Sequence, residues 1–184
     1  MNKKRVFSGV QPTGNIHIGN YLGAISNWVK SQTENENIFC IVDLHSITVP
    51  QDPKILKTKI RELAGLYLAC GIDMQHSTIF VQSHITAHTE LAWILNCFTP
   101  MGWMKRMTQF KEKSAFHQDY INVGLFDYPI LMASDILLYK ANGVPVGDDQ
   151  AQHVELTRTI ARKFNGMFGQ TFPEPDTILS AHSR

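Results

Sequence analysis

The feature that most constrains the fold of this chain is an alternation of short apolar runs with longer segments of helical periodicity. The short runs are rich in Val, Ile and Phe, are bounded by Gly, Asn, Asp or Ser, and lie at 5–10, 37–43, 77–83 and 143–147. Strands separated by single helices are typical of βαβ units, whose right-handed crossovers give a parallel sheet. We therefore predict an α/β fold, in which ligands bind at the carboxyl ends of the strands.

Apolar residues at helical spacing occupy most of the remaining chain. Such segments lie at 18–30, 52–71, 88–98, 128–139 and 147–164. The second segment begins with Asp52 and Pro53, a favourable pair for a helix N-terminus, and ends at Gly71. After Asn165 the pattern is lost, and no partner is predicted for the Pro-containing tail.

Composition restricts the function only weakly. The 184 residues fit one domain, and a formal net charge of +1 favours neither nucleic acid nor a membrane surface. Cys40, Cys70 and Cys97 are widely spaced in apolar contexts, which indicates reduced, buried thiols. The N-terminal apolar run is too short for a signal sequence, and no segment approaches the length of a membrane span. We expect a soluble cytoplasmic protein that does not contact a membrane.

The glycine-rich stretch PTGNIHIGNYLG, residues 12–23, joins the first predicted strand to the first helix. Backbone N–H groups at such a junction, with the positive end of the helix dipole, favour phosphate binding. Gly9 and Gly14 have the spacing of the first two glycines of a P-loop, but Asn-Ile follows where Lys and Ser/Thr are required. The dinucleotide pattern G-x-G-x-x-G is also missing, so neither familiar phosphate loop is present.

The residues left at the mouth of the first helix are His17, Gly19 and Asn20. His17 and Asn20 offer hydrogen-bond donors to a polyphosphate, and Gly19 allows a nucleotide to approach the backbone. A helix-initiating turn with no ligand explains the same residues. The tetrapeptide alone leaves both interpretations open.

Five motifs in order connect this stretch to a known family. HIGN resembles the HIGH signature of class I aminoacyl-tRNA synthetases and related nucleotidyltransferases, with asparagine in the last position. The motifs are FSGVQPTGNIHIGNYLGA, which contains HIGN, with FCIVDLHSITV, RMTQFKEKSA, and DYPILMASDILLY followed by VPVGDDQAQHVELTR. From about residue 6 to 175 they resemble bacterial or organellar tryptophanyl-tRNA synthetases. The resemblance implies a Rossmann-like catalytic domain over 1–175, with helices on both faces of a parallel sheet, and a divergent tail at 176–184.

Asp135 is an ionisable residue on an otherwise apolar face of the helix predicted at 128–139, where it needs a hydrogen-bond donor. A neighbouring group of the protein would satisfy it, and so would an indole N–H, which only donates. The resemblance implies the second role, because the aspartate at this place in tryptophanyl enzymes accepts the indole N–H.

The related tyrosyl enzymes carry a glutamine and a tyrosine where this chain has Met132 and Phe7. Neither Met132 nor Phe7 hydrogen-bonds a phenol in that way, and both suit a flat indole. Tryptophan is therefore the implied amino acid, and a buried tyrosine hydroxyl would be left unpaired. The further tryptophan-binding residues implied are His45, Val144 and Val146 around the side chain, with Tyr128 and Gln150 at the α-amino group.

The segment VPVGDDQ follows a predicted strand, where ligands bind in a parallel sheet. Taken by itself it is a helix N-terminus with two acidic residues in the first turn. The resemblance implies that Asp149 binds the ribose hydroxyls of ATP and that Gly147 permits a close approach. The complete ATP-binding set implied is Gln11, Pro12, Thr13, Gly19, Asn20, Gly147, Asp148 and Asp149.

The reaction implied is attack of the tryptophan carboxylate on the α-phosphorus of ATP, which gives tryptophanyl-adenylate and pyrophosphate, and then transfer to tRNA(Trp). Neither step needs a protein nucleophile, so catalysis is positioning and charge stabilisation. The catalytic residues implied are His17, Asn20 and Lys113, and Mg²⁺ accompanies ATP. Lys111 is the weaker lysine candidate, and a solvated loop would explain both lysines. His84 and His88 lack a third ligand, so no protein metal site is predicted.

Two parts of the family pattern do not occur in these 184 residues. They are a KMSKS loop, whose lysines stabilise the pyrophosphate, and a helical anticodon-binding domain, so we expect slow activation. The segment at 101–107 lacks a usual acidic residue and borders the subunit contact of this dimeric family, and a homodimer is expected. The alternatives are an impaired fragment that binds tryptophan, ATP or partner subunits, and a small nucleotidyltransferase, whose late ISSTxxR-like motif ILSAHSR matches poorly.

Overall fold

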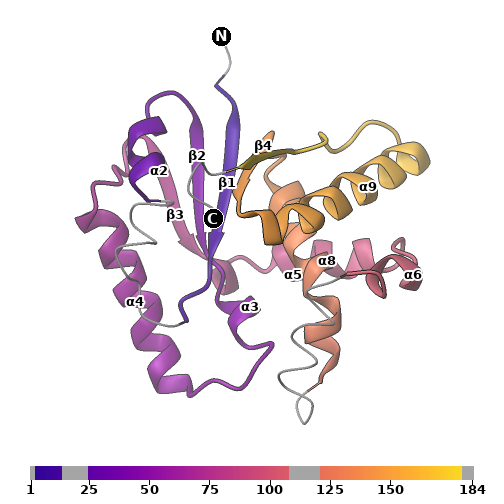
Figure 1. The fold of residues 1–184 in the computed structure, drawn as a ribbon, viewed down its shortest axis with the longest axis horizontal. Helices are drawn as coiled ribbons and strands as arrows, with labels where there is room; N and C mark the ends of the chain where they lie inside the picture. Colours follow the sequence, from indigo (N-terminus) through magenta and orange to yellow (C-terminus); the bar gives the residue numbers. More distant parts are fainter. Residues whose placement is uncertain (1–2, 14–24, 108–120, 180–184) are drawn as a thin grey trace.

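A five-stranded parallel sheet forms the centre of the computed structural model, which describes residues 3–13, 25–107 and 121–179 (Figure 1). The strands are β1 (Arg5–Val10), β2 (Glu36–Ile41), β3 (Ser77–Val81), β4 (Gly143–Val146) and β5 (Asp176–Leu179). Their order in the sheet is β3-β2-β1-β4-β5. The chain moves outward from β1 to β3 and then crosses to the other side of β1, so the carboxyl ends of β1 and β4 form a topological switch point.

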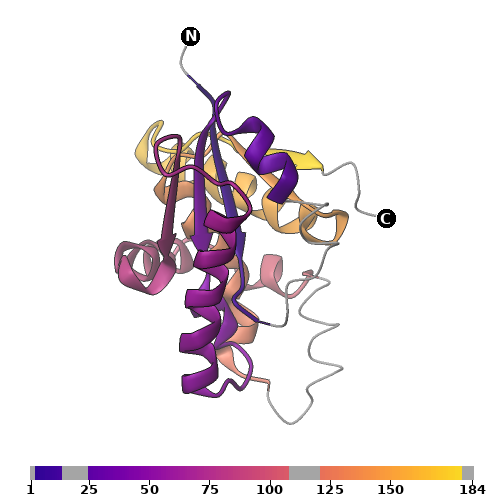
Figure 2. The ribbon, with the colours of Figure 1, turned by 90° about the vertical axis from the view of Figure 1, so that its left-hand side faces the viewer.

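Helices cover both faces of the sheet (Figures 1 and 2). The α-helices are α2 (Ser26–Ser31), α3 (Asp43–Ser46), α4 (Pro53–Ala69), α5 (Ala87–Asn96), α6 (Met101–Met104), α8 (Val123–Leu138) and α9 (Ala151–Phe168), and two short 3₁₀ helices are η2 (Gln82–His84) and η4 (Asp148–Gln150). In Figure 1, α2 and α4 lie to the left of the strands, and α8 and α9 lie to the right. The predicted α/β fold with helices on both faces is confirmed.

The side chains of β2 alternate between two hydrophobic cores. Phe39 and Ile41 pack with residues of α2 and α4, whereas Ile38 and Cys40 pack with Ile136 of α8. A strand that is buried on both faces has no polar side, which is why residues 38–41 of β2 are all apolar. A third core joins α5, α6, α8 and α9 around buried residues such as Leu95, Ile130 and Leu156.

Helix α8 is longer and more deeply buried than its sequence pattern indicates. It begins at Val123 rather than at 128, and Pro129 lies inside it. Because proline usually occurs at the start of a helix, the sequence places the start of α8 too far along the chain. The helix is also buried around most of its circumference, because it packs against both the sheet and the third core. Buried apolar residues therefore occur on more faces of α8 than the one that carries Asp135.

The end of the described chain is the second departure. Residues 176–179 form β5, which pairs in parallel with β4, with Val144 opposite Thr177. The expectation that the tail after Asn165 has no partner is wrong. Helix α9 continues to Phe168 and ends at Gly169, which has a φ of 86°. A four-residue strand that begins with an aspartate gives too weak a pattern to be predicted.

The three cysteines are free thiols, but only Cys40 is buried. Burial raises the pKa of the Cys40 thiol, which disfavours the thiolate. Cys70 is partly buried and Cys97, just after α5, is exposed, so the prediction of three buried thiols is wrong. No helix within the described ranges is both long and apolar enough to cross a membrane.

Asn122 caps α8, the helix that carries Tyr128, Met132 and Asp135 of the site described below. Its Oδ1 accepts a hydrogen bond from the Leu125 N–H at 2.8 Å, and its Nδ2 donates to the Thr48 carbonyl at 2.9 Å. We expect Asn122→Ala to lower the free energy of unfolding by about 1–2 kcal/mol, because both bonds are lost. Asn122→Ser, which retains a capping oxygen, should lose less. Urea denaturation measures both, and equal losses would contradict the role of the cap.

Candidate functional site

A cavity of about 180 Å³ opens at the carboxyl ends of β1 and β4, beside α8. Its lining residues are Phe7, Gly9, Gln11, Val42, His45, Tyr128, Met132, Asp135, Ile136, Val144, Pro145, Val146 and Gln150. This set includes all eight residues that the sequence resemblance implies for tryptophan binding. The crossovers of the sheet bring them together from β1, α3, α8, β4 and η4.

The walls of the cavity are mainly flat and apolar. Phe7 of β1 stacks on Tyr139, with ring centroids 5.8 Å apart and an interplanar angle of 12°. Gly9 has no side chain. A Cβ atom at this position would lie only 3.1 Å from Cγ1 of Val42, so a larger residue would crowd this wall of the cavity. Val144 lies on the neighbouring strand β4. Such walls favour a planar aromatic group.

Asp135 is the charged residue that lines this cavity, and it is only 1% exposed. Its Oδ1 accepts hydrogen bonds from Nδ1 of His88 at 2.6 Å and Nε2 of Gln82 at 2.8 Å. Its Oδ2 accepts from Nε2 of His45 at 2.8 Å and from the same Gln82 amide at 2.9 Å. Of the two interpretations of Asp135, the structure therefore shows donors within the protein, while the carboxylate also borders the cavity.

These contacts decide the ionisation of Asp135. Burial raises the pKa of the carboxyl group, but the opposing effects prevail, and the largest of them are the hydrogen bonds from His45 and His88. The net pKa lies below the ordinary value of 3.8. Asp135 is therefore a buried carboxylate at neutral pH, stabilised by three side chains from three different segments.

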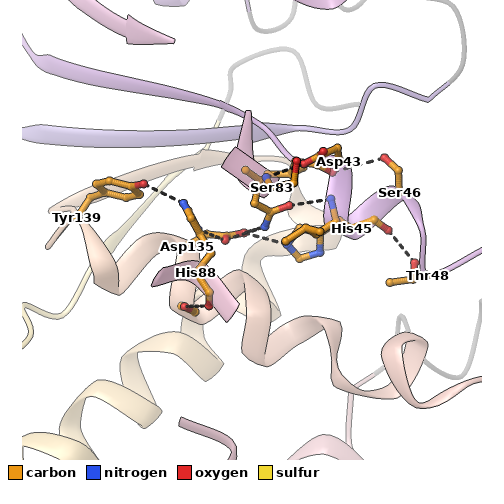
Figure 3. A network of polar contacts seen from close by, with 12 residues as sticks. Asp43, His45, Ser46, Thr48, Ser83, His88, Asp135 and Tyr139 are labelled. Carbon is orange, nitrogen blue, oxygen red and sulfur yellow. Dashed lines mark hydrogen bonds and ion pairs between the residues drawn. The ribbon is translucent and has the colours of Figure 1, made fainter. Parts of the chain in front are cut away.

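A second layer of contacts orients those donors (Figure 3). The Leu44 N–H donates to Oε1 of Gln82 at 3.1 Å, which turns the Gln82 amide nitrogen toward Asp135. His88 forms its second bond, through Nε2, with the Tyr139 hydroxyl at 2.8 Å. Figure 3 shows the network from Tyr139 through His88 and Asp135 to His45.

Sequence reasoning missed the roles of Gln82 and His88. Gln82 follows β3 directly, so its place at the carboxyl end of a strand was a usable signal. His88 was considered only as a metal ligand with His84, which is exposed, whereas both ring nitrogens of His88 contact other side chains. Within the part of the chain that the structure describes, no three metal-ligating side chains form a group.

Tyr128 and Gln150 supply further polar groups to the lining of the cavity. The Tyr128 hydroxyl forms a hydrogen bond of 2.8 Å with Nε2 of His153, a fully buried residue of α9. Gln150 donates from Nε2 to Oδ2 of Asp149 at 3.0 Å. The Tyr128 hydroxyl and the Gln150 amide therefore both have partners within the protein. Both line the cavity, where they could contact a polar group of a ligand.

Only some of the residues predicted to bind ATP lie within the described ranges. Gln11, Pro12 and Thr13 follow β1, and Gly147, Asp148 and Asp149 follow the adjacent β4. Gly147 allows the Asp149 carboxylate to fold back, because a Cβ on Gly147 would lie 2.8 Å from Oδ1 of Asp149. The candidates that lie outside the described residues are His17, Gly19, Asn20, Lys111 and Lys113.

The sheet order, the cavity at the switch point and the covering helices define a Rossmann-like catalytic domain. The family model described as tRNA synthetases class I (W and Y) matches residues 1–181, and the chain belongs to this family. The resemblance inferred from the sequence motifs is therefore confirmed.

Individual relatives agree with this family. The chain is 60% identical over 179 residues to the tryptophan–tRNA ligase of Wolinella succinogenes, which covers 97% of this chain and 55% of the relative. It is 59% identical over 181 residues to that of Synechocystis sp., with 95% and 54% covered. The crystal structure of Campylobacter jejuni tryptophanyl-tRNA synthetase in complex with ADP and tryptophan superposes with a TM-score of 0.93, at 42% identity, over 98% of this chain and 56% of that one. The chain thus spans about half the length of the curated relatives it matches.

The lowered pKa of Asp135 predicts how stability depends on pH. A carboxyl group whose pKa falls on folding stabilises the protein above its unfolded pKa, and that contribution is lost as the pH falls through the folded pKa. We expect Asp135→Asn to lower the free energy of unfolding by about 3 kcal/mol at pH 7, because the donors of His45, Gln82 and His88 lose their acceptor.

The difference in the free energy of unfolding between the wild-type chain and Asp135→Asn should shrink as the pH falls below 3.8, the ordinary pKa of this carboxyl group. Urea denaturation of both proteins at a series of pH values measures it. A difference that stays constant across the series would contradict the stated ionisation of Asp135.

Proposed function

We propose that this chain is the catalytic domain of an ATP-dependent tryptophan–tRNA ligase, which activates L-tryptophan to tryptophanyl-adenylate and pyrophosphate. One observation carries the proposal: the eight side chains implied by the family resemblance, from five separate elements, line a single cavity. The names of the relatives at about 60% identity support the same function.

The cavity favours an indole over a phenol. Asp135 is an acceptor at the end of a space bordered by Phe7 and Val144, which suits a flat ring with one N–H donor. A phenol hydroxyl both donates and accepts, and neither Met132 nor Phe7 would pair with it. We assign the indole N–H to Asp135. The residues assigned to the rest of the amino acid are His45 and Val146 at the side chain, with Tyr128 and Gln150 at the α-amino group.

We assign ATP to the adjoining switch point. Asp149, which is exposed, would accept hydrogen bonds from the ribose hydroxyls, and Gly147 lets the nucleotide approach the turn. Mg²⁺ would enter with the triphosphate and neutralise part of its charge. The other residues assigned to ATP are Gln11, Pro12, Thr13, Gly19, Asn20 and Asp148, and those assigned to catalysis on the phosphates are His17, Asn20 and Lys113.

The chemistry needs position more than a reactive side chain. The tryptophan carboxylate attacks the α-phosphorus in line and pyrophosphate leaves. A hydroxyl of the terminal adenosine of tRNA(Trp) then attacks the activated carbonyl and AMP leaves. Holding the two substrates at adjoining sites supplies most of the rate enhancement of such reactions. A cytoplasmic location fits these substrates.

The purified chain should bind L-tryptophan and reject L-tyrosine in isothermal titration calorimetry. Gln150→Ala should weaken tryptophan binding about tenfold, because a hydrogen bond to the charged amino group is lost. Gln75→Ala, which changes an exposed glutamine before β3, is the matched control and should bind as the wild type does. Tyrosine binding as tightly as tryptophan would contradict the assignment of the cavity.

Tryptophan-dependent exchange of pyrophosphate into ATP tests the activation step directly. Exchange by this chain supports the proposed ligase activity. Tryptophan binding without exchange favours the alternative in which the chain binds tryptophan, ATP or partner subunits but does not complete the reaction. Exchange driven by tyrosine would contradict both.

We also propose that the chain forms a homodimer through α5 and α6. Trp93 of α5 is 72% exposed, and Ile94 and Met101 are exposed on the same two helices, so three large apolar side chains of α5 and α6 are open to a partner. Self-association of one such surface with its copy is the commonest way to cover it.

Trp93→Glu should therefore shift the chain from dimer to monomer in analytical ultracentrifugation, because a charged carboxylate would be buried in the interface. Lys57→Glu, on the exposed side of α4, is a control that introduces the same side chain elsewhere. A monomeric wild-type chain, or a dimer in Trp93→Glu, would contradict the proposed interface.

A further inference from the structure

His88 is a fully buried histidine that does not line the cavity and yet contacts its charged residue. Its side chain is 0% exposed, and its ring lies between Asp135 and Tyr139. The ring also lies near Phe80, with centroids 5.8 Å apart. Placing a ring with two polar nitrogens in this interior is costly unless both are paired, and here both are.

The partners of His88 indicate where its proton is. A carboxylate only accepts hydrogen bonds, so Nδ1 of His88 carries the proton that Oδ1 of Asp135 receives at 2.6 Å. Burial raises the pKa of the Tyr139 hydroxyl, with further contributions from Cys40 and Asp135, so this group remains an O–H. In a neutral ring, Nε2 accepts the hydrogen bond from Tyr139. The two bonds then run in one direction, from Tyr139 through His88 to Asp135, and strengthen each other.

The two oxygens of Asp135 face different surroundings. His45, which bonds to Oδ2, lines the cavity together with Asp135, whereas His88, which bonds to Oδ1, does not. Oδ2 is therefore the oxygen on the cavity side and Oδ1 the oxygen on the interior side. A donor at Oδ1 opposes rotation of the carboxylate and so fixes the direction in which Oδ2 faces the cavity.

We propose that His88 is a positioning residue, which in its neutral Nδ1–H form holds the Asp135 carboxylate in the orientation that accepts a single N–H donor from the ligand. This inference rests on the proposed binding of tryptophan in the cavity. It assigns to the Tyr139 hydroxyl the role of fixing the tautomer of His88.

Two substitutions separate the two bonds of His88. The amide nitrogen of asparagine takes a position close to Nδ1, so His88→Asn retains a donor to Asp135. The amide of glutamine takes a position close to Nε2. In His88→Gln the side chain therefore contacts Tyr139, and Oδ1 of Asp135 loses the donor that Nδ1 of His88 supplies. His84→Gln changes an exposed histidine one turn away and is the control.

The measurement is the ratio of the affinities for L-tryptophan and for β-(3-benzothienyl)-L-alanine, which has sulfur in place of the indole N–H. Calorimetry should give a ratio in His88→Asn and His84→Gln within about threefold of the wild type. His88→Gln should lower the ratio about tenfold by weakening tryptophan binding alone. A merely structural role of His88 would weaken both ligands equally, and that outcome would overturn the proposal.

Tyr139→Phe tests the other end of the network if His88→Gln fails to fold, because it retains the ring that stacks on Phe7. We expect the ratio to fall severalfold. In ¹⁵N NMR spectra of the histidine rings, wild-type His88 should be protonated at Nδ1 alone, and a ring protonated at Nε2 would overturn the proposal. A wild-type chain that binds no tryptophan would instead overturn the proposed function, whereas equal loss of both ligands in His88→Gln overturns only the role of His88.

Discussion

The rest of the site depends on the stabilisation of one buried negative charge, the carboxylate of Asp135. An ion with almost no contact with water is stable only if several donors surround it. These donors come from α3 after β2, from η2 after β3, and from α5, while the carboxylate itself comes from α8. The four segments must therefore meet at the same point. The buried charge thus links the arrangement of the crossovers to the geometry of the cavity.

The order of the strands explains why the cavity lies beside this charge. Because β1 has β2 on one side and β4 on the other, the strand order reverses at β1 and β4, and their carboxyl ends form the place where ligands bind in such sheets. Helix α8 lies beside that place and brings Tyr128, Met132 and Asp135 to it on successive turns. One helix therefore supplies two polar side chains to the cavity and, between them along its axis, an apolar one.

The sequence predicts the parts of this arrangement that have local signals. Four of the five strands coincide with short runs rich in Val, Ile and Phe, and Asp52 caps α4 as its position indicates. The strand β5 and the early start of α8 were missed, because pairing with β4 and packing on both sides are tertiary effects that local periodicity does not report. The cavity residues came from family resemblance. The contacts of Asp135 with Gln82 and His88 span 53 and 47 residues, and no spacing rule connects positions so far apart.

The number of donors on Asp135 also limits what kind of group the cavity accepts. A carboxylate has about four acceptor sites, and His45, Gln82 and His88 already occupy at least three of them. The Gln82 amide nitrogen lies within hydrogen-bond distance of both oxygens, so at most one site is left for a ligand. A group with a single donor matches this, whereas a group with two donors would leave one of them buried without a partner. An indole N–H satisfies this condition. The same three contacts that make the buried charge stable therefore also make it selective, and a substitution that weakens one of them should change both properties together.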